Sequence, residues 1–262
     1  MTFFKNRRPS RRGRVMLQAP GVNAATLGVL IMIAVHLTVL SVYKLWGTTA
    51  GDLLYYRGGL SWDGVRNGQI WQLFTHNWFH GTWSHLALNA VLFYYAAARL
   101  SHVLGSLRIL ILFLICGMGA GLVHILSQAA FPGLPGQPLV GASGGVMGML
   151  LGFFALSPES RMLLIPVSAR NLAKGVLVSS SLLFIMTPGL NLPFMADFGL
   201  WMEGACGESL FQIAHLAHFV GGLLGWVMIL RFFPRLLDIN DLARMRGKSE
   251  SGIVPNSGKE ES

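Results

Sequence analysis

Six separate apolar runs divide this sequence, and each is long enough, or nearly so, to cross a lipid bilayer as a helix. A hydrocarbon core of about 30 Å takes about 20 helical residues. The runs lie at residues 24–43, 84–100, 106–128, 141–157, 174–194 and 209–231. Backbone groups inside lipid must be paired within the protein, which restricts such a chain to helices or closed barrels. We therefore predict an all-α, polytopic membrane protein with six transmembrane helices.

The composition agrees with a membrane location. Hydrophobic residues make up 53% of the chain and charged residues only 12%, a more apolar balance than that of an average soluble domain. The formal net charge of +9 could suggest nucleic-acid binding, but the basic residues lie in the tails and short loops and not over one folded face. We expect no nucleic-acid partner. Cys116 and Cys206 offer neither a disulfide framework nor a metal-binding spacing.

The distribution of basic residues orients the predicted helices. All but three of the 20 lysines and arginines fall in the two tails and in the loops after the second and fourth runs. The positive-inside rule then places both tails in the cytoplasm. We expect a basic tail at 1–23, a membrane domain at 24–231 whose outer loop 47–82 lies in the membrane interface, and a polar, disordered tail at 232–262.

Polar side chains interrupt the second, fourth and sixth runs. His85 and Asn89 lie in the second run, Ser143 opens the fourth, and His218 lies in the sixth. These three runs cross the membrane in the same direction, so the four residues share one depth in its outer half. The fourth run is only about 24 Å long at about 1.5 Å per residue, so it begins below the surface. Unpaired backbone at that depth requires a water-filled cavity.

This set of residues can perform nucleophilic catalysis. His218 is a base of the kind that can take the proton of the Ser143 hydroxyl near neutral pH. The backbone N–H of Ser143, together with His85 and Asn89 on one helix face, can form an oxyanion hole. No carboxylate lies within the spans, so we predict a dyad. Small residues around the serine let a peptide approach it: Gly141, Ala142, Gly144 and Gly145.

Each element alone has a structural alternative. Glycine and serine in membrane helices often serve only helix packing, Asn89 could be an interhelical hydrogen bond, and either His215 or His218 could be a satisfied core histidine. The histidines could also bind a metal: His76, His80, His85, His215 and His218. Membrane zinc hydrolases, however, carry H-E-x-x-H, which is absent here. We expect no metal and no cofactor.

At these residues the chain resembles the rhomboid family of intramembrane serine proteases, over roughly residues 24–231. The family's G-x-S-G appears as Gly141 to Gly144, its A-H-x-x-G-x-x-x-G as Ala217 to Gly225, and its H-x-x-x-N as His85 to Asn89. The resemblance implies a rhomboid-like six-helix bundle. It also selects His218 over His215 as the base, because only His218 is followed by glycines at the family spacing.

The resemblance gives roles to three further residues. Gly221 and Gly225 form a small-residue repeat that would let the sixth helix approach the fourth closely, and His80 is expected to line the wet pocket. Three positions depart from the pattern of many relatives: Gln72 stands in place of an arginine, Met147 in place of an aromatic residue, and Ser101 in place of a glutamate. These changes bear on loop rigidity and rate.

The implied activity is serine-type endopeptidase cleavage of transmembrane protein substrates in the bilayer, in a bacterial inner membrane. The substrates would carry helix-breaking residues and enter laterally past the fifth span. A catalytically inactive rhomboid-like protein that binds membrane clients is the alternative, and retention of both Ser143 and His218 argues against it. A transporter would be expected to show inverted repeats, and none is visible. A protease dedicated to C-terminal sorting tails stays open, and the sequence does not indicate an oligomeric state.

Overall fold

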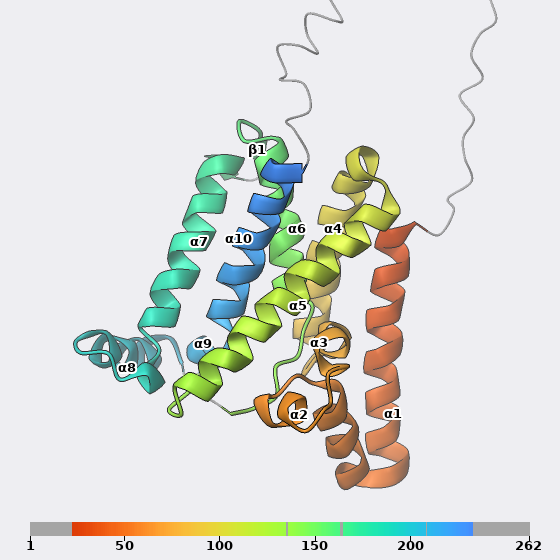
Figure 1. Cartoon of the computed structure of the whole chain (residues 1–262), viewed down its shortest axis with the longest axis vertical. Helices are drawn as coiled ribbons and strands as arrows, with labels where there is room; N and C mark the ends of the chain where they lie inside the picture. Colours follow the sequence, from red (N-terminus) through yellow and green to blue (C-terminus); the bar gives the residue numbers. More distant parts are fainter. Residues whose placement is uncertain (1–22, 135, 163–164, 208, 233–262) are drawn as a thin grey trace, which may run out of the picture.

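The computed structural model describes residues 23–134, 136–162, 165–207 and 209–232, and these residues form an α-helical bundle (Figure 1). A short antiparallel hairpin, β1 (Arg161–Met162) and β2 (Ile165–Ser168), is the only sheet in these ranges. The sequence did not predict this hairpin. The predicted tails at 1–23 and 232–262 lie almost wholly outside the described residues.

Each of the six apolar runs coincides with a long helix. The helices are α1 (Ala24–Gly58), α4 (Trp83–Leu104), α5 (Ser106–Ala130), α6 (Ser143–Leu156), α7 (Ala169–Ile185) and α10 (His215–Phe232). Shorter helices join them: α2 (Trp62–Arg66), α3 (Gln72–Thr75), η1 (His76–Trp78), η2 (Pro188–Leu190), α8 (Met195–Cys206) and α9 (Ser209–Gln212). Three of the long helices, α1, α5 and α10, are long and apolar enough by length and composition to cross a membrane, and α6 is a shorter apolar helix.

The first helix begins and bends at positions set by the sequence. The side chain of Asn23 caps α1 by accepting a hydrogen bond from the Thr26 N–H at 2.9 Å. Gly47 has a φ of 83°, and the helical segment breaks there before it continues to Gly58. The predicted first span, 24–43, therefore corresponds only to the part of α1 before the break. The second part occupies the start of the predicted outer loop.

Two predicted spans have different bounds in the structure. The fifth was expected at 174–194, but α7 begins at Ala169, after the Ser168 side chain accepts a hydrogen bond from the Asn171 N–H at 3.4 Å. It ends at Ile185, shortly before Pro188, which has no N–H to continue a helix. The sixth was expected from residue 209, but the short helix α9 takes its first residues and α10 begins at His215.

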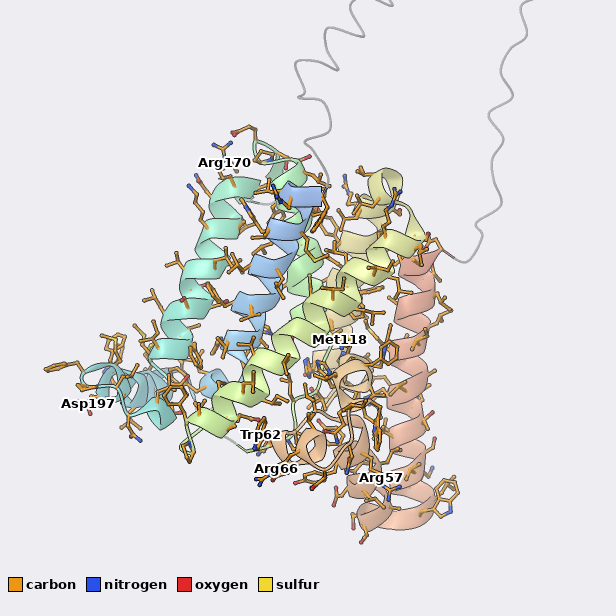
Figure 2. The ribbon with its side chains drawn as sticks, in the orientation of Figure 1. Arg57, Trp62, Arg66, Met118, Arg170 and Asp197 are labelled. Carbon is orange, nitrogen blue, oxygen red and sulfur yellow. The ribbon has the colours of Figure 1, made fainter. Side chains whose placement is uncertain are left out.

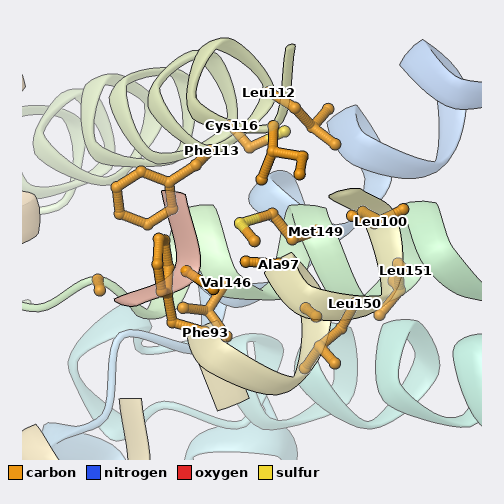
Figure 3. Packing of buried hydrophobic residues seen from close by; sticks show 14 of the residues in the cluster. Phe93, Ala97, Leu100, Leu112, Phe113, Cys116, Val146, Met149, Leu150 and Leu151 are labelled. Carbon is orange, nitrogen blue, oxygen red and sulfur yellow. The ribbon is translucent and has the colours of Figure 1, made fainter. Parts of the chain in front are cut away.

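The core of the bundle surrounds α6. Ten of its 14 residues are buried, and α4, α5, α7 and α10 all contact it. Figure 3 shows the packing between α4, α5 and α6, where the ring of Phe113 meets that of Phe93 edge-on at 5.0 Å between centroids. Met149 and Cys116 fill the space beside these rings and are fully buried. The packing of other helices around α6 is consistent with its content of glycine, because small residues let neighbouring helices approach closely.

The predicted interfacial loop is an ordered structure built around Gln72. This side chain is 1% exposed. Its Oε1 accepts a hydrogen bond from the Ser61 N–H at 3.1 Å, and its Nε2 donates to the Tyr56 carbonyl at 3.0 Å and to Gln69 Oε1 at 2.9 Å. Gln72 therefore ties α2, α3 and the end of α1 together. Figure 2 shows Arg57, Trp62 and Arg66 at this end of the bundle and Arg170 at the opposite end.

Candidate active site

The start of α6 is held in place by the segment that precedes it. Leu139 and Leu60 exchange two backbone hydrogen bonds, of 2.7 and 2.9 Å, and the Gly141 N–H donates to the His76 carbonyl at 2.9 Å. Gly141 has a φ of 121°, which side-chain-bearing residues rarely adopt. The chain then enters the helix, whose first residue is Ser143. A glycine at 141 therefore permits the turn that presents the serine.

Two glycine pairs bring α6 and α10 into backbone contact. A Cβ added at Gly221 would collide with the carbonyl oxygen of Gly144, and one added at Gly225 would collide with that of Gly148. No side chain separates the two helices at these levels. The structure thus brings the glycines of the expected repeat against the helix that carries Ser143.

His85 and Asn89 lie beside the turn that precedes Ser143. A Cβ at Gly141 would come within 2.7 Å of the His85 ring and 3.6 Å of Asn89 Nδ2. Asn89 is 3% exposed, and its Nδ2 has no hydrogen-bond partner among the residues that the structure describes. An unpaired buried donor costs about 1–3 kcal/mol, so a native structure normally retains one only for a reason. This amide is suited to receive an anionic or carbonyl oxygen from a ligand.

The four principal residues predicted from the sequence line one cavity. Its volume is about 780 Å³, and Ser143, His218, His85 and Asn89 all contribute to its wall. The cavity also contacts Phe184 and Thr187 near the end of α7, and Met147 one turn after the serine. No hydrogen bond joins Ser143 to His218 in the described part of the chain. Catalytic hydrogen bonds are often longer in a ligand-free site and shorten when substrate binds.

His80 does not line this cavity as the resemblance implied. It is 2% exposed and packs edge-on against the His85 ring, at 5.1 Å between centroids. Behind it, His36 of α1 contacts the His80 carbonyl oxygen through Nδ1 at 3.1 Å. His36 therefore contacts the backbone of His80, and the His80 ring in turn packs against His85.

His124 of α5 is a wall residue that the sequence reasoning missed. It contributes to the cavity together with Gln128, and within the described part of the chain its Nδ1 has no hydrogen-bond partner. The signal was available, because His124 is an ionisable residue inside the third apolar run. His215 also reaches the cavity, and its Nε2 is 2.8 Å from the Leu210 carbonyl oxygen. Among the described residues no group of His, Cys, Asp or Glu has an arrangement that could hold a metal ion.

The remaining departures have local explanations. Ser101 donates a hydrogen bond to the Ala98 carbonyl at 2.8 Å within its own helix. Gln72, which stands where many relatives carry an arginine, accepts one hydrogen bond in the loop and donates two; its effect on rigidity stays a prediction.

The cavity brings together the hydroxyl of Ser143, the imidazole of His218 and the side-chain amide of Asn89. The first hydrogen bond within α6 runs from the Val146 N–H to the Ala142 carbonyl. The N–H groups of the first three helical residues come before this bond and are not used within the helix. Helix N–H groups of this kind favour negative charge. Such a site can hold a carbonyl group and stabilise the oxyanion that forms when a nucleophile attacks it.

Comparison with known proteins finds rhomboid proteins both by family model and by relatives. Residues 67–235 match the family model of the Rhomboid domain. The chain is 28% identical over 168 residues to "RHOMBOID-like protein 4" of Arabidopsis thaliana, covering 64% of this chain and 36% of that protein. It is 27% identical over 206 residues to "Rhomboid protease GlpG" of Serratia proteamaculans (strain 568), covering 78% of this chain and 60% of that one. It is also 30% identical over 100 residues to "Inactive RHOMBOID-like protein 8" of Arabidopsis thaliana, covering 34% and 28% of the two chains.

Proposed function

Because this chain belongs to the rhomboid family and is a multi-pass integral membrane protein, we propose that it is an intramembrane serine endopeptidase. Its substrates are transmembrane proteins, and its catalytic groups are Ser143 and His218. The observation that supports this proposal most is the single cavity shared by Ser143, His218, His85 and Asn89. A helix-packing role for each residue separately would not require all four to face one space.

The reaction follows from the chemistry of these groups. The Ser143 hydroxyl attacks the scissile carbonyl carbon while His218 accepts its proton. The oxyanion is stabilised by the backbone N–H of Ser143 and by His85 and Asn89. His218 then gives the proton to the leaving amine, and the C–N bond breaks to leave an acyl-enzyme. A water molecule deprotonated by His218 attacks the ester, and the Ser143 hydroxyl is restored as the acid product leaves.

The proposed topology has six spans, formed by α1 up to its break, α4, α5, α6, α7 and α10, with both termini in the cytoplasm of a bacterial cell. The positive-inside distribution supports it, as does the separation of Arg170 from Arg57 and Arg66 at opposite ends of the bundle (Figure 2). The substrate helix enters past α7, where Phe184 of the helix and Thr187, just after its end, border the cavity. It must unwind locally, because a helical backbone does not expose its carbonyl carbons to attack.

Parallel cleavage assays test the dyad. Purified wild-type protein in detergent is given a model membrane-helix substrate, alongside Ser143→Ala, His218→Ala and Ser84→Ala. Ser84 borders the same cavity, so its variant controls for the loss of a serine there. We expect the wild type and Ser84→Ala to cut and the other two variants to be inactive. Cleavage by Ser143→Ala at the wild-type rate would refute the assignment of the nucleophile.

A second candidate is a rhomboid-like protein that binds membrane clients without cutting them. It is favoured by the similarity to a relative named as inactive. If the wild type bound the substrate but left it intact in several lipids, this second function would replace the first.

A further inference from the structure

We propose that the groove between α1 and α4 is a binding site for an anionic phospholipid, with one acyl chain in the groove and the phosphate on Arg99. The groove has a volume of about 620 Å³, within the roughly 300–1,000 Å³ of typical ligand pockets. Val29 of α1 forms one wall, and Ala90, Tyr94 and Ala98 of α4 contribute to the other. It is separate from the cavity that holds Ser143.

The shape of the groove comes from its residue sizes. Ala90 and Ala98 are two turns apart on α4, and between them Tyr94 is 50% exposed on the outside of the bundle. Small side chains next to a large one leave a hollow along the helix. The lining exposes almost no polar surface. A hollow of this kind facing lipid loses dispersion energy unless a flexible hydrocarbon chain fills it.

The charge at one end of the groove identifies the head group. The Arg99 guanidinium carbon lies over the Tyr95 ring, 5.5 Å from its centroid, and both residues border the groove. Where residues are described, the only ion pair joins Arg170 to Glu159, so no carboxylate there neutralises Arg99. A guanidinium presents a planar set of donors that fits phosphate oxygens. An apolar slot ending at an unneutralised arginine therefore matches the two halves of a phospholipid.

The position along the helices fits the cytoplasmic leaflet. Val29 is near the start of α1, and Arg99 is near the end of α4. In the proposed topology both ends lie at the cytoplasmic surface, where anionic lipids give a negative potential. The inference uses this orientation but does not depend on catalysis by Ser143.

Lipid binding by the full-length protein tests the proposal. Native mass spectrometry of the protein in detergent measures the apparent affinity for dioleoylphosphatidylglycerol and for dioleoylphosphatidylcholine. The wild type should prefer phosphatidylglycerol about fivefold, as expected for one arginine next to an anionic lipid. Arg99→Gln should abolish that preference, while Arg231→Gln, which removes an exposed arginine from the end of α10, should keep it.

Filling the groove provides an independent arm of the test. Ala98→Leu should weaken retention of both lipids, and Ala87→Leu, an exposed α4 position outside the groove, should leave retention unchanged. Equal affinity of the wild type for the two lipids would overturn the proposal. So would equal effects of Arg99→Gln and Arg231→Gln. If Ala98→Leu impaired substrate cleavage but left lipid retention intact, the groove would instead be a contact for a client helix, and the lipid proposal would fail.

Discussion

Replacing Gly221 by alanine should separate the two helices that carry Ser143 and His218. The added Cβ would collide with the Gly144 carbonyl oxygen and lie 2.7 Å from its carbonyl carbon. Both atoms belong to the backbone of a buried helix and cannot rotate away. Gly222 offers a matched control, because its Cβ would come close to the end of the Leu151 side chain, at 2.6 Å, and reach Leu177 only at an ordinary 3.6 Å, and the Leu151 side chain can move.

The size of the effect can be worked out from these distances. Carbon atoms pack at about 3.5–4.0 Å, so α10 must move by roughly 1 Å to relieve the contact. Overpacking of this kind costs about 1–3 kcal/mol, and the higher helix propensity of alanine returns up to about 1 kcal/mol. The net loss of stability for Gly221→Ala is thus at most about 3 kcal/mol, and about 2 kcal/mol or less if the full helix propensity of alanine is recovered. A displacement of about 1 Å between catalytic groups can lower the rate about a hundredfold.

Two measurements separate stability from geometry. Thermal unfolding in detergent gives the melting temperature of each variant, and cleavage of the same model substrate gives kcat/KM. We expect Gly221→Ala to be folded, somewhat less stable and about a hundredfold slower, with Gly222→Ala near wild type in both respects. If the two variants had the same melting temperature and the same kcat/KM, close backbone contact at Gly221 would not be what aligns the dyad.

Three further predictions concern the residues around the site. Gln72→Leu should lower the melting temperature more than Gln69→Leu, because it removes three part-buried hydrogen bonds where Gln69→Leu removes one of them, each worth about 0.5–1.5 kcal/mol; equal melting temperatures would contradict the role given to Gln72. Asn89→Ala should lower kcat about 10²–10³-fold with little loss of stability, since its Nδ2 is unpaired; an unchanged kcat would exclude it from the oxyanion hole. Burial lowers the pKa of His80 from 6.5 to about 3. Below pH 6.5 this histidine is therefore protonated in the unfolded state but stays neutral in the folded state. His80 should therefore lower the free energy of unfolding by about 2 kcal/mol at pH 5. If the melting temperature fell equally in wild type and His80→Phe between pH 7.5 and 5, His80 would not be the source of the loss.

The sequence predicted the positions of the long helices, because these depend on the lengths of the apolar runs. The six apolar runs correspond to six long helices. The motifs of the second, fourth and sixth runs pointed to His85, Asn89, Ser143 and His218, which line one cavity, and the glycine repeat pointed to the contact between α10 and α6. The family membership that these motifs suggested is confirmed by the match over residues 67–235. The crossing of the membrane by all six helices and the roles of the site residues stay predictions.

Other features depend on tertiary contacts that no local pattern reveals. The fifth run ends early because a proline follows, which the sequence signalled, but the break between α9 and α10 has no such marker. The helices within 59–82 are too short for a periodic pattern and are held by contacts of Gln72 with residues up to 16 positions away. The supporting position of His80 could not be foreseen either, because it depends on His36, a residue of a helix that the family motifs do not include.

The enclosure of α6 has a consequence for how the protein is made. Gly144 and Gly148 emerge from the ribosome well before their partners, Gly221 and Gly225. Until α10 is synthesised, one face of α6 lacks the surface that covers it in the finished bundle. In the proposed six-span topology this short helix would enter the membrane with that side uncovered, and its contacts are completed only when the last helix docks. A protein shortened before α10 would lack the contacts that Gly221 and Gly225 make with Gly144 and Gly148, so the order of synthesis makes docking of α10 the step that completes them.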